Sequence, residues 1–108
     1  MRRIVKDHRR KRYIRFHIKP LESNSLPTEA EFLQELRKQG RLLFHKELKD
    51  LGCWLIRFQT TSGIIKCHYQ ETETMKALLH SLHSIGSSIV EITPESTSGT
   101  IRGVIRKN

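Results

Sequence analysis

The chain has 108 residues, of which 36% are apolar and 29% are charged, and its formal net charge is +9. This length allows one compact hydrophobic core and is too short for two ordinary domains, so we expect a single domain. No run approaches the roughly 18 apolar residues that a membrane-spanning helix needs, and no apolar stretch follows the basic N-terminus as it would in a secretory signal. We therefore expect a soluble, cytoplasmic protein.

The positive charge is concentrated at the two ends of the chain. Residues 1–20 carry nine basic side chains and one acidic one, residues 102–108 carry three basic ones, and the middle is close to neutral. Such a distribution is typical of binding to a polyanion, because each Lys or Arg set against a phosphate releases a condensed counterion. We interpret residues 1–11 as a basic, flexible arm that precedes a single domain over residues 12–108. A merely solubilising tail is the alternative.

The first strand is predicted over residues 12–18. Apolar and polar residues alternate there, with Ile14, Phe16 and Ile18 on one side, and the strand is expected to end at Pro20. A loop rich in Ser and Asn follows.

The first helix is predicted to begin at a capping box. Thr28 is followed three residues later by Glu31, so that each side chain accepts a hydrogen bond from the backbone N–H of the other residue. A broad apolar stripe then predicts a long helix to about Leu51, with a kink at Gly40 and an end at Gly52. The stripe is wider than one sheet face needs, so we expect some of its members to mediate self-association. These members are Phe32, Leu33, Phe44 and Leu48.

Two further strands, 53–60 and 63–69, are predicted to form a hairpin in which Phe58 lies opposite Ile65 and Arg57 lies opposite Lys66. The register is favoured because it places the apolar residues of both strands on one side.

A second helix is predicted over residues 71–85, and a last strand over 88–93 that is closed by Pro94. The order βαββαβ predicts an α+β, ferredoxin-like or RNA-recognition-type sandwich: a four-stranded antiparallel sheet with two helices on one face. The tail over residues 101–106 is either a short helix or an irregular strand.

Four blocks in the same order carry a resemblance to a known family. These are the strand at 12–18, the hairpin segments 54–58 and 63–67, and the strand 89–92 with the Ser-Gly-Thr-Ile-Arg motif at 98–102. Together they resemble protein component two of archaeal and eukaryotic ribonuclease P.

The resemblance implies a noncatalytic subunit that binds and braces the catalytic domain of ribonuclease P RNA and supports endonucleolytic removal of the 5′ leader from precursor tRNA. It implies three partners: the RNA, a barrel-shaped ribonuclease P protein, and a second copy of the chain in a heterotetramer, with precursor tRNA contacted indirectly. Catalysis would be carried by RNA, with magnesium at the RNA and no cofactor bound by this chain. The compact length favours an archaeal source.

The candidate RNA-binding residues lie in three places: the basic arm, the sheet face away from the helices, and the Ser-Gly-Thr segment with its basic tail. Glycine at position 99 allows a positive φ or a close backbone approach, and Arg102 offers a bidentate fork to phosphate. A tight turn whose hydroxyls only satisfy the local backbone is the alternative for this segment. The residues are Arg9, Arg10, Lys11, Arg12, Arg15, Lys66, Ser98, Gly99, Thr100, Arg102 and Arg106.

Two rival functions remain open. A small self-sufficient ribonuclease would use His17 and His68 as base and acid with Lys66 as the charge stabiliser. A free-standing RNA-binding module would act without protein partners. Cys53 and Cys67 are expected to be buried, reduced thiols, and no spacing predicts a metal site.

Overall fold

The computed structural model of the chain describes residues 10–21, 26–59 and 61–106. Most of the expected arm lies outside these residues, so its flexibility stays a prediction. Within the described ranges no helix is long and apolar enough to cross a membrane. In chain order the strands and α-helices are β1 (Lys11–Pro20), α1 (Glu29–Gln39), β2 (Trp54–Gln59), β3 (Ser62–His68), α2 (Thr72–Ser81), β4 (Ser84–Ile85), β5 (Ser88–Ser98) and α3 (Ile101–Arg106).

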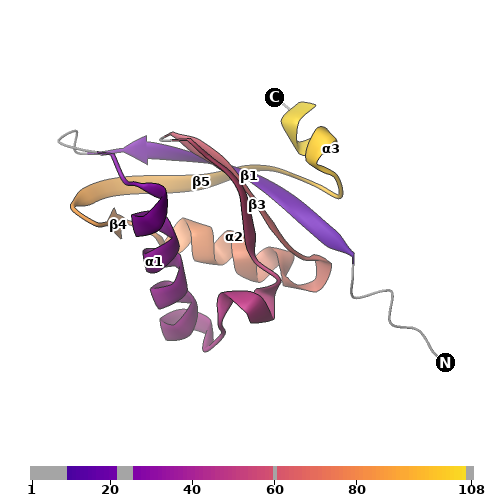
Figure 1. Cartoon of the computed structure of the whole chain (residues 1–108), viewed down its shortest axis with the longest axis horizontal. Coiled ribbons are helices and arrows are strands. Elements are labelled where there is room, and N and C mark those ends of the chain that lie inside the picture. Colours follow the sequence, from indigo (N-terminus) through magenta and orange to yellow (C-terminus); the bar gives the residue numbers. More distant parts are fainter. Residues whose placement is uncertain (1–9, 22–25, 60, 107–108) are drawn as a thin grey trace.

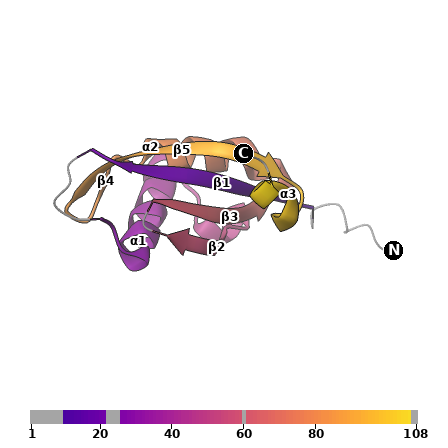
Figure 2. The ribbon, with the colours of Figure 1, turned by 90° about the horizontal axis from the view of Figure 1, so that it is seen from above.

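The strands form one antiparallel sheet in the order β2-β3-β1-β5-β4. Figure 1 shows α1 and α2 on one side of this sheet and α3 on the other side, and Figure 2 shows the strands in front of α1 and α2. The predicted α+β class is confirmed. The predicted four-stranded βαββαβ sandwich is wrong in its count, because the described residues contain five strands and a third helix, α3, which settles the conformation of the tail.

The core lies between the sheet and the first two helices. The predicted inward face of β1, Ile14, Phe16 and Ile18, is fully buried. Phe32 of α1 stacks on Phe16, with 5.3 Å between the ring centroids, and lies 5.2 Å from the ring centroid of Phe58 on β2. Aromatic pairs at such distances add stabilisation beyond the apolar area that they bury.

This core also takes up the apolar stripe that we expected to mediate self-association. Phe32 is fully buried, and Leu33, Phe44 and Leu48 pack against the core. The apolar side chains that remain exposed in this region are Leu42 and Leu43 instead.

Helix α1 begins as predicted and ends earlier than predicted. Thr28 Oγ1 accepts a hydrogen bond from the Glu31 N–H at 3.1 Å, and the Thr28 N–H donates to Glu31 Oε1 at 3.0 Å, which confirms the capping box. The α-helix stops at Gln39 and is followed by a π-helical turn, Gly40–Phe44. The chain then folds back so closely that a Cβ at Gly40 would lie 3.2 Å from the carbonyl oxygen of Lys46.

A short 3₁₀ helix, Leu48–Leu51, completes this connection and ends at Gly52, the residue at which the longer predicted helix was expected to stop. Gly52 has a φ of 65°, the left-handed region that favours glycine, and a Cβ there would lie 2.5 Å from Nδ1 of His68.

Strands β2 and β3 form the predicted hairpin, but the predicted register is wrong. Phe58 lies opposite Gly63 rather than Ile65, and a bulge at Ile56 shifts the pairing further along the strand. Gly63 is closely surrounded: a Cβ at this position would lie 2.5 Å from Cζ of Phe16, so only glycine fits where β3 passes that ring.

The second helix is shorter than the predicted 71–85, since α2 ends at Ser81. Ile85 belongs instead to β4, which pairs with the start of β5 across a two-residue turn. Gly86 in this turn has a φ of 59°. Tight hairpin turns require such a positive φ, and glycine supplies it without strain.

The last strand also differs from its prediction. Pro94 does not close it, and β5 continues to Ser98. A bulge at Glu95 interrupts the pairing with β1 next to the proline. Proline is tolerated at a bulge because the hydrogen-bonded ladder is already interrupted there.

Candidate nucleic-acid interface

The outer face of the sheet, away from α1 and α2, carries basic and aromatic side chains. Strands β1 and β3 are neighbours as predicted, and Tyr13 lies directly opposite Lys66. Arg15 lies opposite Ile64, so Arg15 and Lys66 are diagonal neighbours.

Trp54 of β2 is an aromatic residue that the sequence did not reveal on this face. It pairs with Lys66, whose Nζ lies 6.0 Å from the centre of the Trp54 ring, and it is 66% exposed. The predicted register placed even-numbered residues of this strand inside. The bulge at Ile56 reverses the alternation, and only the observed pairing shows it.

Helix α3 covers part of the outer face and engages Arg15. Arg15 Nη1 donates a hydrogen bond to the carbonyl oxygen of Ile105 at 3.3 Å, and its Nε lies 3.6 Å from Glu95 Oε1. Val104 is fully buried, and its carbonyl oxygen accepts from Ser96 Oγ at 3.5 Å. The side chain of Arg15 therefore joins β1 to α3, and its contact with RNA stays a prediction.

The basic residues at the start of β1 gather around one tyrosine. The guanidinium carbons of Arg10 and Arg12 lie 4.5 and 4.7 Å from the centroid of the Tyr69 ring, within the range of cation–π attraction. The Tyr69 N–H donates to the carbonyl oxygen of Arg10 at 2.9 Å. Lys11 lies opposite His68 and is exposed. Arg9 lies outside the described residues.

The Ser-Gly-Thr segment lies beside this cluster and mainly organises the start of α3. The Thr100 N–H donates to Ser98 Oγ at 3.3 Å, and the Gly103 N–H donates to Thr100 Oγ1 at 2.9 Å. Both hydroxyl oxygens thus accept hydrogen bonds from nearby backbone N–H groups. These contacts are the ones expected for a tight turn, the alternative interpretation of this segment.

Of the two possibilities given for Gly99, a positive φ is not found, because the described glycines with positive φ are Gly52 and Gly86. Gly99 does lie close to a side chain of β1, since a Cβ at Gly99 would lie 3.2 Å from Arg12 Nη1. The segment therefore meets the start of β1. Arg102 is exposed and makes no hydrogen bond or ion pair with the described residues, while Arg106 ends α3 and its side chain lies outside what the structure describes.

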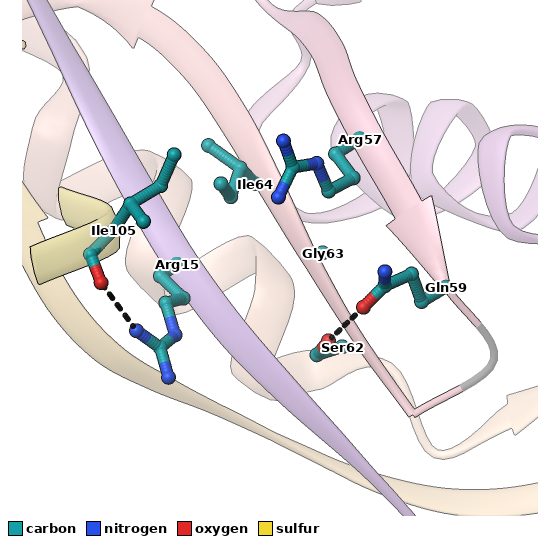
Figure 3. A pocket seen from close by; sticks show the side chains of 7 residues that line it. All are labelled: Arg15, Arg57, Gln59, Ser62, Gly63, Ile64 and Ile105. Atoms are coloured by element: carbon teal, nitrogen blue, oxygen red, sulfur yellow. Dashed lines mark hydrogen bonds between the residues drawn. The ribbon is translucent and has the colours of Figure 1, made fainter. Parts of the chain in front are cut away.

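A pocket of about 230 Å³ opens on the outer face between the β2–β3 hairpin and α3. Figure 3 shows its lining: Arg15, Arg57, Gln59, Ser62, Gly63, Ile64 and Ile105. Sequence reasoning placed Arg57 on this face but assigned it no role. The sequence did not indicate that α3 packs on the outer face of the sheet, so the pocket could not be predicted.

The histidine pair of a self-sufficient ribonuclease is not assembled. His17 lies opposite Ser62 and His68 lies opposite Lys11, so the two histidines are separated by six residues along β1. At about 3.3 Å per residue this distance is about 20 Å, far beyond hydrogen-bond reach of one phosphodiester.

The thiols and carboxylates offer no alternative chemistry. Burial raises the pKa of Cys53 to about 12 and the pKa of Cys67 to about 11, which keeps both thiols protonated and unreactive. A hydrogen bond from Arg41 lowers the pKa of Glu47, but this pair lies at the end of α1, away from the outer face. In the described ranges no group of three His, Cys, Asp or Glu residues is placed to hold a metal.

Comparison with known proteins decides the family. The model of the Rpp14/Pop5 family, a family of ribonuclease P proteins, matches residues 12–107. The chain belongs to the Rpp14/Pop5 family. This membership confirms the resemblance that the four sequence blocks indicated, and it supports a protein subunit of the ribonuclease P and MRP type.

The fold of this Rpp14/Pop5 protein is similar to that of a solved structure. It matches a chain of the cryo-EM structure of yeast ribonuclease MRP with a TM-score of 0.66 and 11% sequence identity, over 85% of this chain and 76% of that chain. At this identity the likeness shows a shared fold alone. No curated protein matches the chain significantly.

Proposed function

We propose that this chain is a noncatalytic protein subunit of ribonuclease P, which binds and braces the catalytic domain of the ribonuclease P RNA and so supports removal of the 5′ leader from precursor tRNA. The observation that carries the proposal is the family match over residues 12–107. The RNA supplies the chemistry and holds the magnesium, and the protein supplies positive charge and shape.

The arrangement of the basic residues supports this role. Arg10 and Arg12 are gathered on Tyr69, beside the turn that leads to the exposed Arg102. Lys66 and Trp54 lie on the outer face of the sheet. A surface that combines arginines, a lysine and two exposed aromatic rings suits the phosphates of a folded RNA and its unpaired bases.

The separation of His17 from His68 and the raised pKa values of both thiols support a noncatalytic role. Such a subunit raises the activity of an RNA without cleaving RNA itself.

The proposed assembly also contains protein partners. A barrel-shaped ribonuclease P protein and a second copy of this chain would complete a heterotetramer, and precursor tRNA would be contacted indirectly. The exposed Leu42 and Leu43 are available for one of these contacts, because they lie in the π-helical turn after α1 and are exposed while their neighbours pack in the core. A cytoplasmic, archaeal setting belongs to the same proposal.

Purification of the tagged chain from its native cell tests this function. Sequencing of the copurifying RNA should give ribonuclease P RNA together with precursor tRNA, and mass spectrometry should give a barrel-shaped partner protein. Recovery of an unrelated RNA population without protein partners would instead support a free-standing RNA-binding module.

A further inference from the structure

The pocket on the outer face has an apolar floor and a polar rim. Ile64, which is only 4% exposed, and Ile105 of α3 supply the apolar surface, while Arg57, Gln59 and Ser62 supply polar groups from the hairpin. Its volume of about 230 Å³ lies below the roughly 300 Å³ at which pockets for drug-sized ligands begin. A small, flat group such as a single nucleobase fits this size.

The two arginines that line the pocket differ in their contacts. Arg15 is engaged by the carbonyl oxygen of Ile105 and by Glu95, which fixes the wall on the α3 side. The side chain of Arg57 is exposed and makes no hydrogen bond or ion pair with the described residues. Its guanidinium points over Ile64 toward the interior of the pocket (Figure 3). Arg57 is therefore the arginine that can donate to a ligand.

Gln59 is oriented by its neighbour on the other side of the turn. Ser62 Oγ donates a hydrogen bond to Gln59 Oε1 at 3.2 Å, which occupies the amide oxygen and leaves the amide nitrogen to donate (Figure 3). The polar rim thus offers donors from both Arg57 and Gln59. A ligand that fits must present acceptors at its edge.

We propose that this pocket is a subsite for one unpaired RNA nucleotide whose base is uracil or guanine, each of which has a keto oxygen at C4 or C6. The base lies on Ile64 and Ile105, and its keto oxygen accepts from Gln59 and Arg57. Cytosine and adenine carry an amino group at the equivalent position, C4 or C6, which cannot accept. The O2 oxygen is common to uracil and cytosine and so does not distinguish them. A paired base has its edge occupied and its faces stacked, so only an unpaired base enters. The inference rests on the proposed RNA-binding function and adds a base preference to it.

Two short single-stranded RNAs of equal length, an oligouridine and an oligocytidine, test the subsite. They carry the same charge and bases of the same shape, so the ratio of their dissociation constants reports the base edge and not the phosphates. Fluorescence anisotropy with the full chain at a fixed salt concentration should give about fivefold or tighter binding of the oligouridine, the lower end of what a well-placed hydrogen-bond pair contributes to discrimination.

Three variants locate the preference. Arg57→Ala and Gln59→Ala should each bring the ratio close to one. Arg37→Ala removes an exposed arginine from α1, on the other side of the sheet. This variant should keep the ratio of the dissociation constants even if it weakens the binding of both RNAs. Circular dichroism confirms that each variant folds.

The failure of this inference differs from the failure of the proposed function. Equal binding of the two RNAs by the wild type, or a preference that survives both pocket substitutions, overturns the subsite and leaves RNA binding intact. A chain that binds neither oligonucleotide nor ribonuclease P RNA overturns both.

Discussion

The side chain of Arg12 lies on the ring of Tyr69, with 4.7 Å between the guanidinium carbon and the ring centroid. The same side chain approaches Gly99, where a Cβ would lie 3.2 Å from Arg12 Nη1. Tyr69 follows β3 and Gly99 follows β5, so one arginine links the starting point of the arm to two other parts of the chain. The start of β1 is therefore held beside the turn before α3.

The residues at this point should contribute affinity for RNA without specificity. Replacing Arg10, Lys11 and Arg12 by Gln removes up to three phosphate contacts, so the slope of log K against log salt should fall by up to about two units on a single-stranded RNA. The control replaces three exposed cations on the helix side of the molecule, Arg37, Lys38 and Lys49, by Gln. Equal changes of slope in the two variants would mean that the arm only adds net charge.

The two glycines around the turn should respond differently to alanine. A Cβ at Gly103 would collide with Ser98 Oγ and lie 2.9 Å from Thr100 Oγ1, so Gly103→Ala should displace α3 and cost about 1–3 kcal/mol of the free energy of unfolding. A Cβ at Gly99 would approach only the far end of the flexible Arg12 side chain. Gly99→Ala should therefore change the free energy of unfolding by less than about 0.5 kcal/mol. Urea unfolding measures both, and a larger loss for Gly99→Ala would refute this assignment.

Arg102 should matter for RNA and not for the fold. It is exposed and has no hydrogen-bond or ion-pair partner in the described part of the chain. Arg102→Ala should leave the free energy of unfolding within about 0.5 kcal/mol of the wild type and weaken binding to ribonuclease P RNA about tenfold, as expected for a lost bidentate phosphate contact. If the variant unfolds more easily while its folded fraction binds RNA normally, the residue is structural.

The buried thiols should make stability fall at alkaline pH. Burial raises the pKa of each cysteine in the fold from its ordinary value of 9.0, to about 12 for Cys53 and about 11 for Cys67. Their contribution is fully present below about pH 9 and is lost as the pH rises through the folded values, because the unfolded chain releases its thiol protons first. Each thiol adds a slope of up to about 1.4 kcal/mol per pH unit in this window.

The control for this prediction is the double variant Cys53→Ala, Cys67→Ala. Urea unfolding between neutral and alkaline pH should show a shallower fall for the variant than for the wild type. Parallel curves would mean that the thiols ionise equally in both states.

Local signals predicted those elements that neighbouring residues alone determine. The capping box of Thr28 and Glu31 needs only one turn of chain, and the sequence placed it correctly. The alternation of Ile14, Phe16 and Ile18 likewise identified the central strand and its buried face. These features depend on spacing within one element, which sequence patterns report directly.

The predictions were wrong where the structure depends on contacts between residues that are distant in the sequence. The register of the hairpin includes a bulge at Ile56, which the alternation of residues did not reveal, and Ile85 is an apolar residue whose burial alone does not distinguish a helix from a short strand. The bulge beside Pro94 depends on the partner strand. The pocket needs α3 to fold back over the sheet, so the position of Arg57 in its lining could not be predicted from the sequence.

Reconstituted cleavage of precursor tRNA tests the central claim most directly. Ribonuclease P RNA, a barrel-shaped partner protein and this chain are combined at limiting magnesium, and each component is omitted in turn. The proposed function predicts faster leader removal with the chain than without it, and no cleavage by the chain alone. Cleavage by the chain alone that is abolished by His17→Ala or His68→Ala would contradict the account.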